Sequence, residues 1–210
     1  MSSFAELSNE EFLSLLASHA PAPGGGGASA MAGALGAALS SMVGNLTVGK
    51  EAFAAQEEQI VALLSEATSL REKLLQCADE DAKVFEYFMS VYKLPKQTEE
   101  EKRARTQAIR SAAKKAASIP LEIARSSFAV LKISVGMAKF GNPNVITDAT
   151  CSAILAYASL RCAAYNVFVN LSLTKDEAFN KAARKELADM QHEGYLLEEK
   201  VINRTNEVLG

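Results

Sequence analysis

The stretch that decides the fold runs from Glu51 to Leu94 and reads EAFAAQEEQIVALLSEATSLREKLLQCADEDAKVFEYFMSVYKL. It contains neither glycine nor proline, and residues of high helix propensity dominate it. As one continuous helix it would be about 66 Å long at 1.5 Å per residue. A compact domain of this chain length has a radius of gyration of only about 17 Å. We therefore expect a helix that bends, protrudes or lies in an elongated bundle, with a partner subunit covering the excess length.

Outside this stretch, almost every boundary signal is also a helix signal, and no segment shows the sustained alternation of a strand. The predicted fold class is all-α: an elongated up-and-down helical bundle with long, partly kinked helices, dimeric, built as one domain over residues 1–210. The expected segments are a short helix opened by a capping box of Ser8 and Glu11, a helix over about 27–48, a helix opened by Thr98 and Glu101 that Pro120 ends or kinks before it continues to about 139, a helix from the turn Gly141–Asn142–Pro143 to about 171, and a last helix opened by Thr174 and Glu177.

Composition argues against several classes of function. The net charge of −3 gives no reason to expect nucleic acid or an anionic membrane surface as a partner. The three cysteines form no Cys-x-x-Cys pair and the two histidines lie far apart, so we expect reduced thiols and no metal site. Acidic residues stand near the N-terminus where a secretory signal would be basic and then apolar. We expect a cytoplasmic protein.

No charged residue occurs from Ala20 to Gly49. This length suits a membrane span. Glycine, alanine and serine dominate the stretch, however, and large apolar side chains are few. A tightly packed core helix is therefore the favoured interpretation, and no membrane partner is expected.

One carboxylate stands on the apolar stripe of the long helix. Leu74, Cys77, Phe85 and Phe88 recur at helical spacing, and Asp81 completes the stripe between them. A carboxylate on an apolar face is costly unless it is paired or used. Burial would also raise its pKa toward the range that a general acid needs. The structural alternative is an Asp81 that binds a nearby cation or backbone group.

Four further polar positions interrupt uncharged surroundings. Asp148 is the only charge between Lys139 and Arg161, although an acid in the first turns of a helix also suits the helix dipole. Lys50 follows thirty uncharged residues, either as a cation at the mouth of a pocket or as a solvated helix end. Asn166 and Asn170 lie one turn apart in an apolar run and could bind a ligand or another helix.

The segment PGGGG, from Pro23 to Gly27, precedes a helix start. Its backbone N–H groups can face an anion, and glycine allows a ligand to approach closely. It is neither a Walker loop nor a Rossmann turn, because no Gly-Lys-Ser/Thr follows and no strand precedes it.

Together these motifs resemble the family of formiminotetrahydrofolate cyclodeaminases and methenyltetrahydrofolate cyclohydrolases, over about residues 12–208. The resemblance implies an all-helical homodimer with no metal or redox cofactor, a tetrahydrofolate derivative as substrate, and a proton-donor aspartate. In the family's D-x-D-A-x-x-F pattern that aspartate is the second one, here Asp81. The matching motifs are APGGGGASAMAGALGAALSSMVGNLTVGK (22–50), DEDAKVF (79–85), LPK (94–96), IPLEIA (119–124), GNPNVITDA (141–149) and AAYNVFVNL (163–171).

The implied reaction converts 5-formiminotetrahydrofolate to 5,10-methenyltetrahydrofolate and ammonia by acid-assisted cyclisation, because ammonia leaves only when protonated. Hydrolysis of 5,10-methenyltetrahydrofolate to 10-formyltetrahydrofolate remains the alternative, and a helical scaffold or binding protein is the distant one. The expected catalytic residues are Asp81 and Lys50. The expected substrate-binding residues are Gly24, Gly25, Gly26, Gly27, Ser29, Asn142, Asp148 and Asn166.

Overall fold

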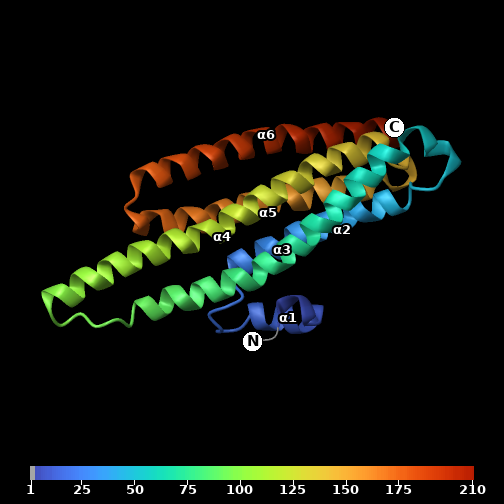
Figure 1. The fold of residues 1–210 in the computed structure, drawn as a ribbon. Helices are drawn as coiled ribbons and strands as arrows, with labels where there is room; N and C mark the ends of the chain where they lie inside the picture. Colours follow the sequence, from blue (N-terminus) through green and yellow to red (C-terminus); the bar gives the residue numbers. More distant parts are fainter. Residues whose placement is uncertain (1–2) are drawn as a thin grey trace.

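The computed structural model describes residues 3–210, and this part of the chain is helical with no strand. Five long helices run alternately up and down an elongated bundle, and the short helix α1 lies against one side of it (Figure 1). The elements are η1 (Phe4–Glu6), α1 (Asn9–Leu16), α2 (Gly25–Asn45), η2 (Glu51–Gln56), α3 (Glu57–Val91), α4 (Glu99–Phe140), η3 (Pro143–Val145), α5 (Ile146–Thr174) and α6 (Glu177–Leu209).

The expected elongation is confirmed. α3 has 35 residues and α4 has 42, which correspond to about 52 Å and about 63 Å. The long glycine-free stretch is helical as expected, but its first turn is the separate 3-10 helix η2. Pro120 does not end the fourth helix, because α4 continues through it to Phe140.

α2 packs through a face of very small residues, as the sequence predicts. A Cβ atom at Gly33 would lie 2.8 Å from the Ser127 hydroxyl and 2.9 Å from the Ser159 hydroxyl. A Cβ atom at Gly36 would lie 3.0 Å from the backbone oxygen of Ser152. Buried hydroxyls then join the helices, since Ser159 donates to the Ser29 carbonyl at 2.6 Å. The uncharged helix is thus a core element that approaches α4 and α5 closely.

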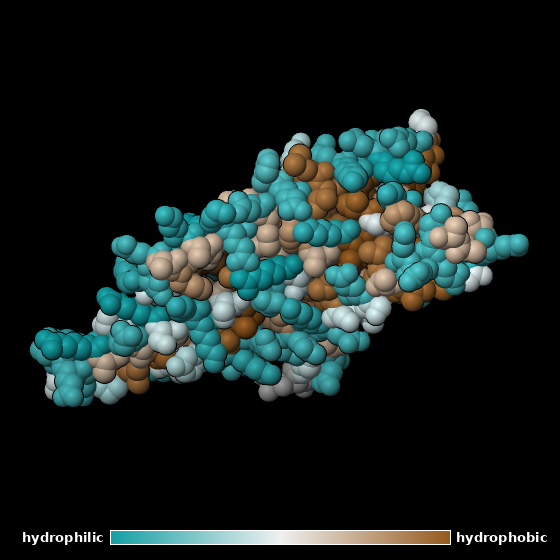
Figure 2. Space-filling view, turned by 45° about the horizontal axis from the view of Figure 1, so that its top comes forward, coloured by the Kyte–Doolittle hydropathy of each residue, from teal (hydrophilic) through white to brown (hydrophobic). Residues whose placement is uncertain are grey.

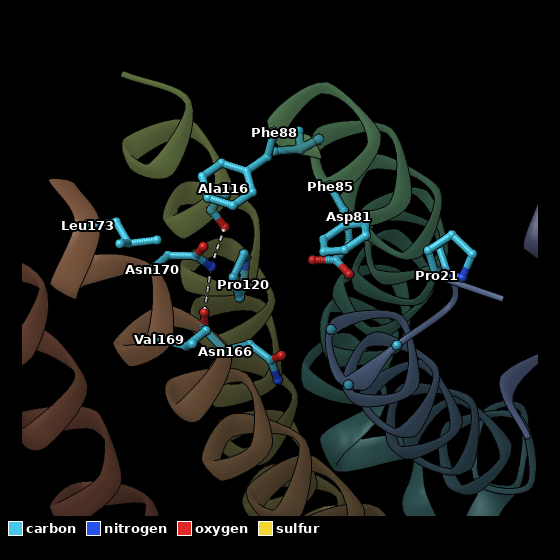
Figure 3. Close-up of a pocket in the computed structure, with 15 residues that line it drawn as sticks. Pro21, Asp81, Phe85, Phe88, Ala116, Pro120, Asn166, Val169, Asn170 and Leu173 are labelled. Carbon is cyan, nitrogen blue, oxygen red and sulfur yellow. Dashed lines mark hydrogen bonds between the residues drawn. The ribbon is translucent and has the colours of Figure 1, made fainter. Parts of the chain in front are cut away.

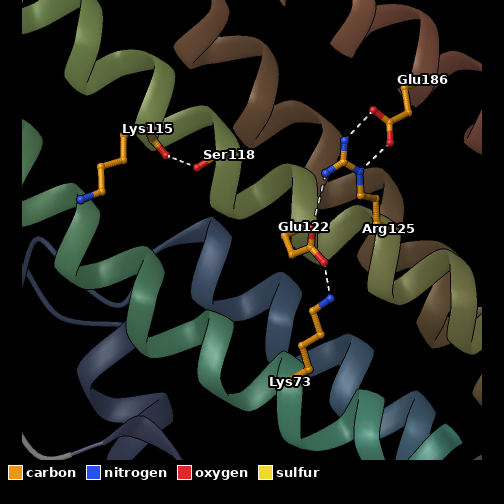
Figure 4. A network of polar contacts seen from close by, with 6 residues as sticks. All are labelled: Lys73, Lys115, Ser118, Glu122, Arg125 and Glu186. Carbon is orange, nitrogen blue, oxygen red and sulfur yellow. Dashed lines mark hydrogen bonds and ion pairs between the residues drawn. The ribbon is translucent and has the colours of Figure 1, made fainter.

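Charged side chains tie the outer helices together. Arg125 of α4 donates to both carboxylate oxygens of Glu186 on α6, at 2.5 and 2.8 Å, and Glu122 pairs with Lys73 of α3 (Figure 4). At the other side, Asp79 of α3 accepts from the Ser3 hydroxyl at 2.5 Å and from the Phe4 backbone N–H at 2.7 Å. Asp79 therefore anchors the N-terminal segment.

Two of the three predicted capping boxes are confirmed, those of Ser8 with Glu11 and Thr98 with Glu101. The third prediction was wrong. Asp176 is the N-cap of α6, and its carboxylate accepts from the Phe179 backbone N–H at 3.0 Å. Helix α5 extends to Thr174, which leaves only a two-residue link in which Asp176 occupies the capping position.

The surface is mostly hydrophilic, and apolar side chains gather toward the end of the bundle where the chain ends (Figure 2). Two helical segments, Gly25–Asn45 and Pro143–Thr174, are long and apolar enough to cross a membrane by composition. Such helices also occur as core helices of soluble bundles, and 61% of the apolar window in the first is buried. Both helices leave large apolar side chains exposed outside the pocket described below, namely Leu35, Met42, Ile154 and Tyr165.

Candidate active site

A pocket of about 280 Å³ lies where α2 begins. α3 and α5 form its two walls, α4 forms its floor, and the N-terminal glycines of α2 close one end (Figure 3). Asp81 is the one charged residue among those that line it. The lining residues are Pro21, Ala22, Gly24, Gly25, Gly26, Asp81, Val84, Phe85, Phe88, Ala116, Pro120, Asn166, Val169, Asn170 and Leu173.

The Asp81 carboxyl group lies directly against the backbone of Gly26. A Cβ atom at this position would overlap all three heavy atoms of the carboxyl group, so any side chain there would displace Asp81. The glycine at position 26 therefore permits the close approach of the carboxyl group to the first turn of α2. Asp81 is turned inward, as the apolar stripe predicts, and it faces the wall formed by α5 (Figure 3).

The pKa of Asp81 is raised above its usual value, chiefly because burial disfavours the charged form. The Gly27 backbone N–H opposes this shift by stabilising the carboxylate. This N–H belongs to the first turn, where the backbone donors have no partner within the helix. One turn earlier on α3, burial raises the pKa of the Cys77 thiol to about 11, with smaller contributions from Glu80 and Glu122. That thiol is protonated at neutral pH, so it is a poor nucleophile.

Asn166 and the glycine segment meet at the pocket, as the sequence predicts. A Cβ atom at Gly25 would lie 3.1 Å from Oδ1 and 3.2 Å from Nδ2 of Asn166, so this side chain covers the start of α2. Ser29 takes a different place. Its buried hydroxyl donates to the Gly26 carbonyl at 2.8 Å, which supports the first turn of α2 without lining the pocket.

The structure does not bring Lys50, Asn142 and Asp148 to this pocket within one chain. Lys50 follows the C-terminal end of α2, and about 30 Å of helix separates that end from Gly25. Asn142 donates to the Leu46 carbonyl at 3.2 Å and caps η3, so it connects helix ends at the far end of the bundle. Asp148 stands in the first turn of α5 at that same end. The sequence shows that Lys50 follows the glycine-rich helix, but it does not show which end of that helix forms the pocket.

The lining includes residues that the sequence did not indicate, among them Phe85, Pro120 and Ala116. Phe85 was assigned to the core stripe, yet it is 38% exposed and forms part of the pocket wall. Pro120 was expected only to end or kink a helix, and it forms the floor together with Ala116. Their contact with Asn170 depends on tertiary packing, which sequence spacing alone does not reveal. Within residues 3–210, no three His, Cys, Asp or Glu side chains cluster as ligands for a metal ion.

Comparison with known proteins gives consistent matches over most of the chain. Residues 8–189 match the family model described as formiminotransferase-cyclodeaminase. A methenyltetrahydrofolate cyclohydrolase of Methylorubrum extorquens is 43% identical over 192 residues, which cover 91% of this chain and 92% of that protein. The formimidoyltransferase-cyclodeaminase of Rattus norvegicus is 29% identical over 91% of this chain, which spans only 35% of the rat protein.

A solved structure supports the same assignment. The crystal structure of a formiminotetrahydrofolate cyclodeaminase from Thermotoga maritima superimposes with a TM-score of 0.88 and 29% sequence identity, over 98% of this chain and 99% of that one. The all-helical bundle is therefore a shared architecture, and the chain is a member of the formiminotransferase-cyclodeaminase family.

Proposed function

We propose that this protein is an enzyme acting on the one-carbon bridge of tetrahydrofolate, with Asp81 transferring the proton. The observation that carries the proposal is a single carboxyl group, of raised pKa, facing a pocket otherwise lined by apolar side chains, glycines and two carboxamides. A raised pKa makes such a carboxyl group better suited to carry a proton to a nitrogen of the substrate. Phe85 and Phe88 offer apolar contacts for a flat ring.

Hydrolysis of 5,10-methenyltetrahydrofolate is the activity to test first, because the 43% identical relative is named a methenyltetrahydrofolate cyclohydrolase and matches over 92% of its length. In this reaction water adds to the bridge carbon and gives one proton to the Asp81 carboxylate. Asp81 then returns the proton to N5 as the bond between carbon and N5 breaks. The hydroxyl proton leaves to solvent, and 10-formyltetrahydrofolate remains.

Cyclodeamination of 5-formiminotetrahydrofolate is the second candidate, favoured by the structural match at a TM-score of 0.88. Here N10 attacks the formimino carbon and its proton passes to the formimino nitrogen. Protonated Asp81 then gives a second proton to that nitrogen as the carbon–nitrogen bond breaks, so that ammonia leaves and the methenyl cation remains. Both reactions share the bridge carbon and the need for one positioned proton carrier. We propose no bound cofactor in either case, the folate being the substrate.

Absorbance of the methenyl form decides between the two. It falls during hydrolysis and rises during cyclodeamination, so purified protein is given each substrate in turn. Replacing Asp81 by Asn keeps the shape of the side chain and removes the proton carrier, and turnover should fall by about 10²- to 10⁴-fold. No turnover with either substrate, or a near-normal Asn variant, would contradict the assignment.

We also propose a cytoplasmic homodimer without membrane or nucleic-acid partners. The exposed apolar side chains on α2 and α5 lie on neighbouring helices, and a second copy of the chain would cover them. Replacing Leu35 by Glu should yield monomers in sedimentation analysis. Leu13→Glu provides the control, because Leu13 is equally exposed but lies on α1. A wild-type protein that sediments as a monomer would exclude the dimer.

A further inference from the structure

The floor of the pocket contains a helix defect. Pro120 lies inside α4 and has no backbone N–H, so it cannot donate to the carbonyl of Ala116 one turn earlier. A pocket-lining carbonyl without a partner is costly in an apolar environment. The side chain of Asn170 on α5 supplies the missing donor, with Nδ2 at 3.3 Å from the Ala116 oxygen (Figure 3).

The second hydrogen of the same amide is also used. Asn170 Nδ2 donates to the Asn166 carbonyl at 2.9 Å. A primary amide has two N–H donors, and both are now bound to backbone oxygens. The flipped orientation would place Oδ1 against two carbonyl oxygens, so repulsion excludes it. The amide is therefore held with its nitrogen toward the backbone.

This orientation leaves Oδ1 as the atom that Asn170 can offer to a ligand. No hydrogen bond to Oδ1 occurs within residues 3–210, and Asn170 lines the pocket. A fixed acceptor recognises an N–H donor and disfavours a carbonyl oxygen or ring nitrogen at the same place. Asn170 lies on the α5 side of the pocket, and Asp81 lies opposite it on α3 (Figure 3).

We propose that Pro120 and Asn170 act as one unit that orients the substrate ring. Pro120 frees the Ala116 carbonyl, that carbonyl fixes the Asn170 amide, and Oδ1 then accepts a hydrogen bond from the amino and N3–H edge of the pterin. This inference rests on the proposed folate activity. Oδ1 meets this edge because Asp81 and Asn170 lie on opposite sides of the pocket. A pterin whose bridge nitrogen faces Asp81 turns its opposite edge, which bears the N–H donors, toward α5.

Binding of 5-formyltetrahydrofolate, measured by calorimetry, tests the unit through a double-mutant cycle. Asn170→Ala should weaken binding about three- to ten-fold, the effect of one uncharged hydrogen bond. Pro120→Ala restores the N–H in α4 and loosens the amide, so it should weaken binding in the same direction. The double variant should bind no more weakly than Asn170→Ala. In this background the Ala116 carbonyl has its own donor, so the variant folds even if Asn170→Ala alone does not.

Two controls separate recognition from a merely structural role. Ser118→Ala removes an exposed hydroxyl on the same helix, outside the pocket, and should bind like the wild type. A folate analogue with hydrogen in place of the 2-amino group should bind the wild type several-fold more weakly, but should lose little further affinity for Asn170→Ala.

The outcomes are distinct. A wild-type protein that binds no folate refutes both the proposed function and this inference. Two results would refute the orienting unit alone, provided that the wild type binds folate. One is a Pro120→Ala variant that binds as tightly as the wild type. The other is a double variant whose loss of affinity equals the product of the two single losses.

Discussion

Replacing Gly26 by Ala should damage the proton carrier directly. The added Cβ atom would overlap the carboxyl group of Asp81, which must move by about 1 Å to restore ordinary van der Waals separation. A displacement of this size at a catalytic group costs about 100-fold in turnover. Crowding of a packed site costs about 1–3 kcal/mol of unfolding free energy, against which the better helix propensity of alanine offsets up to about 1 kcal/mol.

The matched control is Gly24→Ala, since a Cβ atom there has nothing within 4 Å and the backbone φ is −125°. We expect Gly24→Ala to keep kcat within about three-fold and to act mainly on KM, because Gly24 lines the pocket but its substitution leaves the Asp81 carboxyl group in place. Turnover is followed by methenyl absorbance, and stability by chemical denaturation. A folded Gly26→Ala protein with turnover close to that of Gly24→Ala would refute the claim that Asp81 must lie against this backbone.

Three other predictions follow from the same geometry. Asp81→Asn should be more thermostable than the wild type at neutral pH, and this difference should vanish in acid. Below the ordinary pKa of an aspartate, Asp81 is protonated in both the folded and the unfolded protein. Above it the unfolded protein ionises more readily than the folded one, so the wild type loses stability as the pH rises. Asp176→Ala should lower the free energy of unfolding by about 1 kcal/mol, because Asp176 caps α6, and Glu177→Ala should lower it by clearly less. Equal losses would instead support a capping box of Thr174 and Glu177. Arg125→Met should cost under about 1 kcal/mol, measured by denaturation in low and high salt, because its pair with Glu186 is half exposed and screened; a larger, salt-independent loss would contradict this.

Helix existence was predictable because it depends on local signals. The Ser8 and Thr98 caps and the glycine-free stretch are such signals, and each was confirmed. The α5–α6 boundary was not predictable in the same way. The sequence predicted Thr174 as the cap, but Asp176, two residues further on, is also a residue type that caps helices. Because α5 extends three residues past its expected end, to Thr174, the capping position falls to Asp176.

The position of Asp81 was predictable for a different reason. Helical periodicity fixes which side of α3 faces inward, and a carboxylate on that side stands out against its apolar neighbours. The same method could not place Lys50, Asn142 and Asp148. Periodicity predicts which face of a helix is buried, but it does not predict which end of the bundle a residue occupies. Only the bundle's topology shows that these residues gather at the end remote from Gly26.

The pocket itself follows from the short length of α2. This helix has 21 residues, whereas α3, α4 and α5 have 35, 42 and 29, and these three continue past its first turn. A space remains between α3 and α5, and the N-terminus of α2 points into it (Figure 3). Two opposing effects then act on one carboxyl group: burial favours its protonated form, and the free N–H of Gly27 favours its ionised form. Because a proton carrier must both accept and release its proton, both effects suit the role: burial of Asp81 favours the proton-holding form, and the first turn of α2 favours the ionised form.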